Sequence, residues 1–384
     1  MVRCAFFMVS GRKLSKLLCN RKFSIIIVLF LLYFFGIFTL FFEKSYSLYY
    51  ANHFDKQIAV FVNQWLKNEV PQITGYNNYN YKFIYKCEKK CKVDDDGPLR
   101  LVYIVKSATR NFDKREGIRN SWGFEKRFSD VEIRTVFMLG IDQDDGIQKR
   151  IREESKAKGD IVQVDFQDTY YNNTIKTLMA MKWVLDHCNK AKFYFFSDDD
   201  MYVSTKNVLR FVRNPIEYPG YLEVPVKSVQ LSDQEENPAY LHGKEIKTIV
   251  DIELRDDNEL YAGYVFRNSR PMRYLFSKWY VPVDEYPYDL WPPYVTAGAY
   301  VLSNRALKKL YYASMYVRHF RFDDIYLSML AKSVNIVPLH SAEFYFYKKS
   351  YDPYGYRYVI ASHGYDNPEE LRWVWNDQKS NGNA

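Results

Sequence analysis

Three consecutive carboxylates, Asp198–Asp200, are the residues whose type and spacing most directly predict chemistry in this chain. They follow Phe193–Phe196, an apolar run with the length and composition of a buried strand. Acidic groups crowded at a strand end repel one another unless water solvates them or a cation neutralises them. Oxygen ligands favour hard ions such as Mg²⁺ or Mn²⁺, which commonly bridge a diphosphate. The triplet predicts such a site, with a solvated acidic turn as the alternative.

Alternating strand-like and helix-like segments, beginning at Arg100, must position this triplet. Short apolar runs predict strands and periodic stretches predict helices in alternation. The predicted strands are 101–105, 133–139, 161–166 and 193–196, and the predicted helices are 113–122, 145–158 and 174–188. Such strands pair mainly in parallel and bind ligands at their carboxyl ends. This stretch has no Gly-rich phosphate motif, so cations or a metal must hold any phosphate.

An uncharged run of twenty residues, Phe23–Phe42, follows a basic N-terminal stretch. A helix of this length spans about 30 Å, the thickness of the hydrocarbon core of a bilayer. The run exceeds the apolar part of a cleavable signal, and no Ala-x-Ala-like site follows it. We therefore expect a cytoplasmic tail at 1–22, a single transmembrane signal anchor at 23–42 and a luminal body. A buried core helix is the alternative.

The charge and composition support this topology and exclude two other classes of protein. The 384-residue chain has a formal net charge of +8, and residues 1–22 hold six basic residues and no acidic one. The remaining chain carries only +2, so general binding of nucleic acid is not expected. With 47% hydrophobic residues, the chain is also too apolar for a disordered protein.

Three cysteines and one sequon fall in the part that we expect to be luminal. Cys87, Cys91 and Cys188 leave one thiol unpaired. The spacing of the first two permits a small loop-closing disulfide, although the pairing stays open. The sequon at Asn172 predicts N-glycosylation. The polar residues 43–97 are interpreted as a stem before a catalytic domain at 98–384.

Several short segments, in a fixed order, resemble the β-1,3-galactosyltransferase and β-1,3-N-acetylglucosaminyltransferase family, and the acidic triplet resembles the D-x-D motif of Golgi nucleotide-sugar glycosyltransferases. The segments are 114–123, 137–140, 159–170, 172–176, 198–200, 291–298 and 322–326. The resemblance covers roughly residues 100–375. It implies a GT-A-type fold, a Rossmann-like mixed and mostly parallel sheet flanked by helices. It also implies inverting β-1,3 transfer of a hexose from a UDP-sugar to a glycan acceptor, by a type II protein of the Golgi membrane.

The resemblance also implies roles for residues around a metal and an acceptor. Asp200 is implied as the direct ligand of Mn²⁺ or Mg²⁺, with Asp198 directed toward the ribose and Asp199 beside them. His363 is implied as a further metal ligand, and an ordinary surface imidazole is the alternative. Asp324 is implied as the base that takes the acceptor proton, with an ordinary pKa near 4. An acidic helix cap is the alternative for Asp324.

Charged residues at the strand ends are expected to hold the nucleotide. Arg115 and Arg119 lie four residues apart on one predicted helix face, so both can reach the same diphosphate or uracil edge. Lys106 follows the first strand, and Asp168 and Lys176 flank the end of the third strand. Each residue alone fits a solvated charge equally well. Their shared location favours donor binding.

Departures from the family pattern leave the donor sugar and the acceptor open. Ser328 stands where the family usually has Gly. Val295, Ala297 and Ala299 stand where it often has Cys or Gly. Residues 214–260 form a longer stretch than in the family, interpreted as an acceptor-side loop or a surface insertion. The alternative function is a catalytically inactive family member that binds sugar or forms a complex. A metal-dependent phosphohydrolase is a further rival function. Whether the protein forms a homo- or hetero-dimer stays open.

Overall fold

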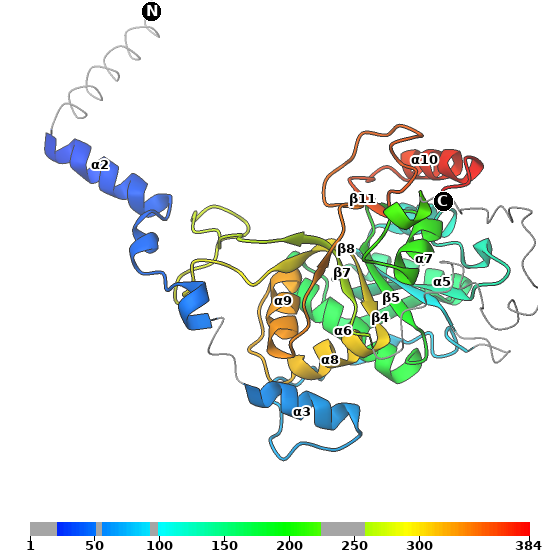
Figure 1. Cartoon of the computed structure of the whole chain (residues 1–384), viewed down its shortest axis with the longest axis horizontal. Helices are drawn as coiled ribbons and strands as arrows, with labels where there is room; N and C mark the ends of the chain where they lie inside the picture. Colours follow the sequence, from blue (N-terminus) through cyan, green and yellow to red (C-terminus); the bar gives the residue numbers. More distant parts are fainter. Residues whose placement is uncertain (1–20, 51–55, 93–98, 224–257) are drawn as a thin grey trace, which may run out of the picture. The chain divides into compact units, whose positions relative to one another are not determined.

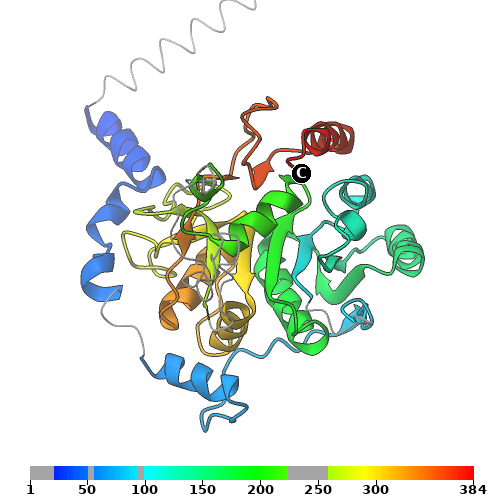
Figure 2. The same cartoon turned by 45° about the vertical axis from the view of Figure 1, so that its right-hand side comes forward.

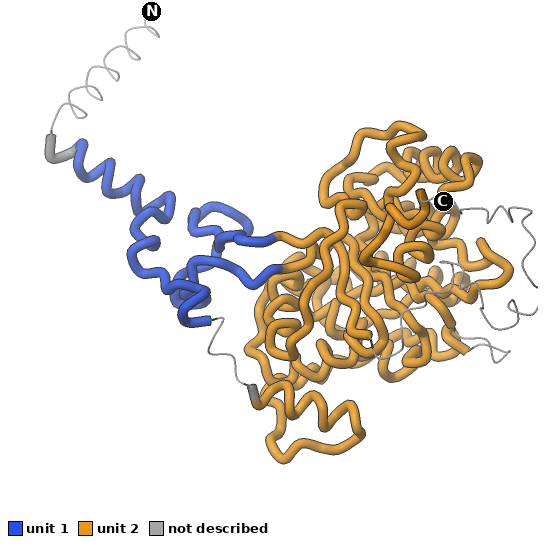
Figure 3. Tube along the Cα trace, viewed as in Figure 1, with its two compact units in different colours: residues 1–54, 267–293 blue, residues 55–266, 294–384 orange. Residues whose placement is uncertain are grey.

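The computed structural model describes residues 21–50, 56–92, 99–223 and 258–384 (Figure 1). Two compact units divide the chain: residues 1–54 with 267–293, and residues 55–266 with 294–384 (Figure 3). Every residue predicted to act in catalysis or binding belongs to the second, larger unit. That unit also includes residues 55–97 of the segment 43–97 that was interpreted as a stem.

Within the described residues, an eight-stranded mixed sheet forms the centre of the larger unit, in the order β1-β4-β3-β2-β5-β8-β7-β9. Its strands are β1 (Phe83–Tyr85), β2 (Leu101–Lys106), β3 (Ile133–Ile141), β4 (Ile161–Gln167), β5 (Phe193–Asp198), β7 (Tyr261–Phe266), β8 (Tyr294–Ser303) and β9 (Leu339–His340). β4, β3, β2 and β5 form a parallel block, and β8 runs antiparallel to β5 and β7. The predicted mixed α/β sheet is confirmed.

Helices cover both faces of this sheet (Figures 1 and 2). One face packs against α4 (Phe112–Arg119), α5 (Asp145–Lys158), α7 (Thr205–Arg213) and α10 (Pro368–Ser380), and the other against α6 (Asn173–His187), α8 (Asn304–Ser314) and α9 (Asp323–Ser333). Local sequence sets the helix ends. The side chain of Asp144 caps α5, and Gly159 ends it with a left-handed φ of 65° that glycine adopts without a Cβ clash.

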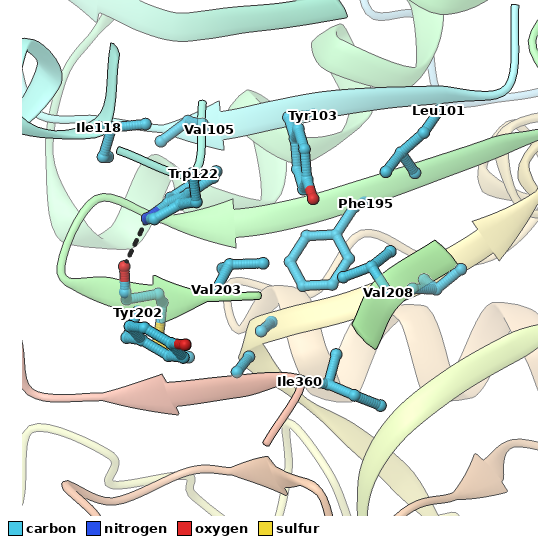
Figure 4. Close-up of a cluster of buried hydrophobic side chains, with 14 of the residues drawn as sticks. Leu101, Tyr103, Val105, Ile118, Trp122, Phe195, Tyr202, Val203, Val208 and Ile360 are labelled. Carbon is cyan, nitrogen blue, oxygen red and sulfur yellow. Dashed lines mark hydrogen bonds between the residues drawn. The ribbon is translucent and has the colours of Figure 1, made fainter. Parts of the chain in front are cut away.

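A second, three-stranded sheet lies beside the main one and follows the acidic triplet directly. It pairs β6 (Met201–Val203) with β11 (Ala361–His363), which in turn pairs with β10 (Phe344–Tyr345). Side chains from both sheets share one apolar core, in which Trp122 Nε1 donates a 2.9 Å hydrogen bond to the carbonyl of Met201 (Figure 4). The triplet is therefore held between two strands that are each anchored in the core.

Part of the predicted stem packs on the larger unit. Helix α3 (Lys56–Leu66) contacts α8, and Asn77 Nδ2 donates to the carbonyl oxygens of Ser314 and Val317. These partly buried hydrogen bonds hold the segment against the helical layer.

The cysteine pairing also differs from the small loop that the spacing permits. Cys91 is bonded to Cys188 at the end of α6, and Cys87 is the free thiol among the cysteines that the structure describes. The sulfur of Cys87 donates to the carbonyl of Ile161 at 2.8 Å, and burial raises the pKa of this thiol to about 12. In the chain-entropy model, closing the loop between Cys91 and Cys188, which are 97 residues apart, contributes about 4.7 kcal/mol to stability.

The smaller unit contains α2 (Arg21–Phe34), followed by short helical turns. Glu43 accepts hydrogen bonds from Arg270 and Arg273, each at 2.8 Å. Helix α2 ends at Phe34, inside the run predicted as an anchor. Within the described residues, no helix has both the length and the apolar character needed to cross a membrane.

Candidate active site

The carboxyl ends of the four parallel strands bring the predicted charged residues to one edge of the sheet. Lys106 ends β2 and lies opposite Asp198, which ends β5. Asp142 and Asp168 follow β3 and β4. Parallel strands expose their ends on the same side, so this clustering follows from the topology that the sequence predicted.

Lys106 is the buried cation at the centre of this edge. Its Nζ lies 3.1 Å from Asp198 Oδ1 and 2.8 Å from Asp323 Oδ2, and it donates to the carbonyl of Ala297 at 3.1 Å. Burial alone lowers the pKa of Lys106, but the charges of the two carboxylates outweigh it and raise the pKa above its usual value. All three donors of the ammonium thus have protein acceptors. The prediction that Lys106 contacts the nucleotide finds no geometric support.

Two adjacent carboxylates begin helix α9 and differ in environment. Asp323 Oδ2 accepts from Lys106 and from Thr177 Oγ1, the latter at 3.0 Å. Burial raises the pKa of Asp323, but Lys106 outweighs this effect and lowers it. Burial, and then the charge of Asp323, raises the pKa of Asp324 to about 7. Asp324 is therefore a stronger base than an ordinary carboxylate, because its pKa is higher. A general base works best when its pKa lies near the operating pH.

Asp200 and His363 form the pair expected to hold a metal. His363 Nε2 lies 3.2 Å from Asp200 Oδ2, because β11 pairs with β6 directly after the triplet. Burial raises the pKa of Asp200, but the hydrogen bond with His363 outweighs it and lowers the pKa. The same hydrogen bond raises the pKa of His363. Among the described residues, the buried Asp200 Oδ1 has no hydrogen-bond partner.

An unpartnered carboxylate oxygen beside an imidazole nitrogen fits a divalent cation, because buried polar atoms otherwise find partners. In the described part of the chain, no group of three or more His, Cys, Asp or Glu side chains could hold a metal. The protein would thus supply at most the two ligands Asp200 and His363. Substrate phosphates and water commonly complete such a site for Mg²⁺.

Asp199, expected to contact the donor, instead fixes the loop after β2. Its Oδ2 accepts from Ser107 Oγ at 2.7 Å, from Asn111 Nδ2 at 2.9 Å and from the N–H of Ala108 at 3.3 Å. Lys114 Nζ lies 3.7 Å from its other oxygen. A buried carboxylate with these donors positions the loop that borders the site.

Arg115 and Arg119 share one face of α4, as predicted, but they reach a carboxylate of the protein. Glu154 on α5 accepts from both guanidinium groups, and Arg119 also pairs with Asp160. Arg115 is fully buried, and a buried charge requires a partner of opposite sign. The prediction that both arginines contact the diphosphate or uracil finds no geometric support, because these donors tie α4 to α5.

Asp168 and Lys176 are brought together as a buried pair at 2.8 Å. Lys176 Nζ also donates to the carbonyl of Ser107, and Asp168 Oδ2 accepts from the N–H of Gly140. A Cβ at Gly140 would lie 2.7 Å from the carbonyl oxygen of Phe166, so only glycine fits this close approach. The pair therefore links the ends of β2, β3 and β4.

Sequence reasoning missed Lys114 as a site residue, although it belongs to a segment that carried the family resemblance. Lys114 lies on α4, 2.7 Å from Asp366 and 3.7 Å from Asp199, and part of its side chain is exposed. Burial lowers its pKa, but Asp366, Asp199 and Asp200 outweigh this effect and raise it. Its proximity to the triplet makes it a cation available to a phosphate.

A cavity of about 210 Å³ adjoins these residues, with Asp198 and His363 in its wall. A larger hollow of about 510 Å³ lies beside residues 84–90 and contains none of the predicted site residues. Location next to the charged groups identifies the smaller cavity as the relevant one.

Asn172 remains a prediction as a glycosylation site. Its side-chain nitrogen donates to the carbonyl of Gln167 at 2.8 Å, and Thr174 of the sequon is buried. A glycan on Asn172 would have to replace that hydrogen bond.

Comparisons with known proteins agree on one family. A family model described as galactosyltransferase matches residues 113–230 and 238–342. "Beta-1,3-galactosyltransferase brn" of Drosophila melanogaster is 43% identical over 290 residues, which cover 75% of this chain and 77% of that protein. "Beta-1,3-galactosyltransferase 1" of Mus musculus is 29% identical over 304 residues, covering 79% and 80%.

Solved structures are only distantly similar. The galactosyltransferase LgtC, solved with donor and acceptor sugar analogs, has a TM-score of 0.33 and 10% identity over 74% of this chain and 100% of its own. Mouse xyloside xylosyltransferase 1 has a TM-score of 0.32 and 11% identity over 69% and 96%.

The substitution Lys106→Met should destabilise the fold strongly, because it leaves Asp198 and Asp323 buried without a counter-charge. We expect a loss of about 3–5 kcal/mol in the free energy of unfolding, measured by urea denaturation at pH 7. Lys190→Met, at an exposed lysine, is the matched control and should change it by less than about 0.5 kcal/mol. A loss below about 1 kcal/mol for Lys106→Met would contradict this role.

Proposed function

The chain belongs to the galactosyltransferase family, and we propose that it is an inverting, metal-dependent β-1,3-hexosyltransferase that moves galactose or an N-acetylhexosamine from a UDP-sugar to a glycan acceptor. The family supports glycosyl transfer as the reaction. A relative named as a β-1,3-galactosyltransferase supports galactose as the first donor sugar to test. The observation that carries the proposal is the pair of carboxylates that begins α9, in which Lys106 neutralises Asp323 while burial and the charge of Asp323 raise the pKa of Asp324.

Asp324 acts as the general base in this proposal. Its carboxylate takes the proton of the acceptor hydroxyl, and the acceptor oxygen attacks C1 of the donor sugar as the bond to UDP breaks. Attack from the side opposite the leaving group inverts the configuration at C1. Asp323 stays ionised because Lys106 neutralises it, and its charge keeps the pKa of Asp324 high.

Cations around the triplet stabilise the leaving group. Asp200 and His363 would hold Mn²⁺ or Mg²⁺, which would neutralise charge on the departing diphosphate. Lys114 supplies a protein cation on the same side, since Asp199 and Asp200 both act on its pKa. Asp198 remains available to the donor, because only its Oδ1 is paired with Lys106.

We also propose that the protein is a single-pass type II protein of the Golgi membrane with a luminal catalytic unit. Support comes from the uncharged run 23–42, the six basic residues before it and the disulfide, which forms in oxidising compartments. The full chain should stay in the membrane pellet after alkaline carbonate extraction and co-localise with a Golgi marker. Release into the soluble fraction would contradict the anchor.

Transfer itself is tested with the full chain in detergent. UDP-galactose, UDP-GlcNAc and UDP-GalNAc are offered with Mn²⁺ and a panel of defined glycan acceptors. We expect one donor to give a product whose linkage is β-1,3 by NMR, and EDTA to abolish the reaction. Binding of UDP and Mn²⁺ without transfer from any donor would favour the inactive sugar-binding alternative. Phosphate release from simple esters would favour a phosphohydrolase.

The substitution Asp324→Asn should remove the base without disturbing the donor site. We expect kcat to fall by about 10²- to 10⁴-fold while the affinity for UDP, measured by calorimetry, is unchanged. Asp186→Asn, at an exposed carboxylate on α6, is the matched control and should keep full activity. Turnover at the wild-type level in Asp324→Asn would overturn the assignment.

The pH profile supplies an independent check on Asp324. The base must be deprotonated, so activity is lost as the pH falls below its pKa and is present above it. We therefore expect kcat to rise up to about pH 7 and then level. Asp323, Lys106 and Asp198 are the charged groups that act on Asp324. The residual activity of Asp324→Asn should lack this inflection, and an unchanged inflection would assign it to another group.

A further inference from the structure

We propose that a pocket formed by α3, α6, α8 and residues 70–80 binds a pyranose ring that carries one negative charge, at a site separate from the acidic triplet. The pocket has a volume of about 320 Å³, at the small end of the range of about 300–1,000 Å³ for ligand sites. Its lining contains none of the residues predicted to act in catalysis or donor binding, and every lining residue belongs to the larger unit. The inference therefore goes beyond the proposed transfer reaction.

Two aromatic side chains, Trp65 and Tyr316, form a fixed wall of this pocket. Trp65, on α3, stacks on Tyr312 with ring centroids 5.5 Å apart and an angle of 11° between the ring planes. Its Nε1 donates to the hydroxyl of Tyr316 at 3.0 Å, and that hydroxyl donates to the carbonyl of Ile73 at 3.2 Å. Rings that are already held in place lose little conformational entropy when a ligand binds.

Residues 70–80 form another wall of the pocket and are fixed against the end of α8. Asn77 Nδ2 donates to the carbonyl of Ser314 at 2.8 Å. A Cβ at Gly75 would lie 2.6 Å from the Cβ of Met315, so only glycine fits this close approach. Both contacts lie within the protein itself, so this wall is in place before any ligand binds.

The hydroxyl of Tyr311 is a buried polar group that lines the pocket without a partner. Tyr311 is only 7% exposed, yet its hydroxyl makes no hydrogen bond within the residues that the structure describes. Burial raises the pKa of Tyr311, so the hydroxyl keeps its proton and can donate. The exposed side chains of Thr74, Asn78 and Asn80 also line the pocket and form no hydrogen bond in the described part of the chain. Because buried polar atoms normally find partners, these groups favour a ligand rich in hydroxyls.

Lys182, on α6, brings a positive charge to the pocket. Its side chain is half-buried, and none of the described residues that line the pocket is acidic. Among the described residues, Lys182 has no partner in an ion pair or a hydrogen bond. Asp186, one turn further along α6, acts electrostatically on Tyr311 but is exposed and does not line the pocket. A half-buried ammonium beside aromatic rings favours a ligand with one negative charge, because an unpaired charge is costly there.

An acidic sugar has all the groups that this pocket can contact. A pyranose has C–H bonds across one face, which pack on an aromatic ring, and hydroxyls around its edge, which bond to amides and hydroxyls. A carboxylate or a sulfate on the ring accepts a charged hydrogen bond from Lys182. A nucleoside diphosphate fits less well, because one ammonium leaves its second negative charge without a partner.

Binding is tested with the full chain in detergent, by saturation-transfer NMR titration. The probes are methyl β-D-glucuronide with a carboxylate, galactose 6-sulfate with a sulfate, and the neutral methyl β-D-glucoside. We expect the glucoside to bind at least about tenfold more weakly than the better acidic probe, because it lacks the charged hydrogen bond to Lys182. The better acidic probe identifies the acidic group. If neither acidic probe shows saturable binding, or if the glucoside binds equally well, the proposal is overturned.

Two variants assign the binding to this pocket. Lys182→Met should weaken binding of the acidic probe by about tenfold or more and remove its advantage over the glucoside. Tyr311→Phe removes one hydroxyl and should weaken binding of both probes by about 2- to 10-fold. Lys190→Met, at an exposed lysine just after α6, is the matched control and should bind like the wild type. Thermal unfolding checks that each variant is folded. Binding within about twofold of the wild type in both Lys182→Met and Tyr311→Phe would exclude the pocket as the site.

Two further measurements separate this pocket from the transferase site. Excess UDP with Mn²⁺ should leave binding of the acidic probe unchanged, whereas displacement of the probe would place it at the triplet and overturn the proposal. Transfer to a neutral acceptor should keep its wild-type kcat and KM in Lys182→Met and Tyr311→Phe. If the wild-type chain transfers no sugar, the proposed function fails, and the NMR titration still decides whether the pocket binds an acidic sugar.

Discussion

One buried ammonium group, that of Lys106, sets the arrangement on which the site depends. It joins the ends of β2 and β5 to the first turn of α9, so Asp198 of the acidic triplet and Asp323, the neighbour of the proposed base, share one counter-charge. Without that charge the carboxylates would repel one another in a region of low dielectric. Other buried charges near Lys106 are also paired with a charge of opposite sign. The pairs are Lys176 with Asp168 and Arg115 with Glu154, and each joins different elements of the fold. The edge of the sheet is thus held together by its charges as well as by its apolar core.

The location of the site could be predicted from the sequence, because it follows from order along the chain. Apolar runs that alternate with periodic stretches predicted the parallel block, and the triplet at the end of β5 marked the edge. The roles of Arg115 and Arg119 could not be predicted in this way. Their partner Glu154 lies on another helix, 39 and 35 residues away, and only the packing of α4 on α5 brings the three side chains together. The spacing of Arg115 and Arg119 predicted that they share one face of a helix, but it could not predict that Glu154 is their partner.

Long-range pairing also produces features that local sequence patterns do not carry. Burial, Asp323 and Asp198 raise the pKa of Asp324, and Lys106 lowers it, although Asp198 and Lys106 come from other elements, β5 and β2. His363 meets Asp200 only because β11 pairs with β6. Cys91 pairs across 97 residues, although a nearer cysteine was available. Apart from the charge of Asp323, which precedes Asp324 in the sequence, each of these interactions is determined by the tertiary fold.

The disulfide also has a mechanical consequence. Strands β2, β3 and β4 and helix α6 lie inside the loop that Cys91–Cys188 closes, whereas β5, β8 and α9 lie outside it. A pulling force between the two chain ends would pass through the covalent bond and bypass the hydrogen bonds of the enclosed strands. The enclosed part, with Lys106 and the Asp168–Lys176 pair, is therefore shielded from load. Under tension, the elements outside the loop, including α9 with Asp324, would carry the load.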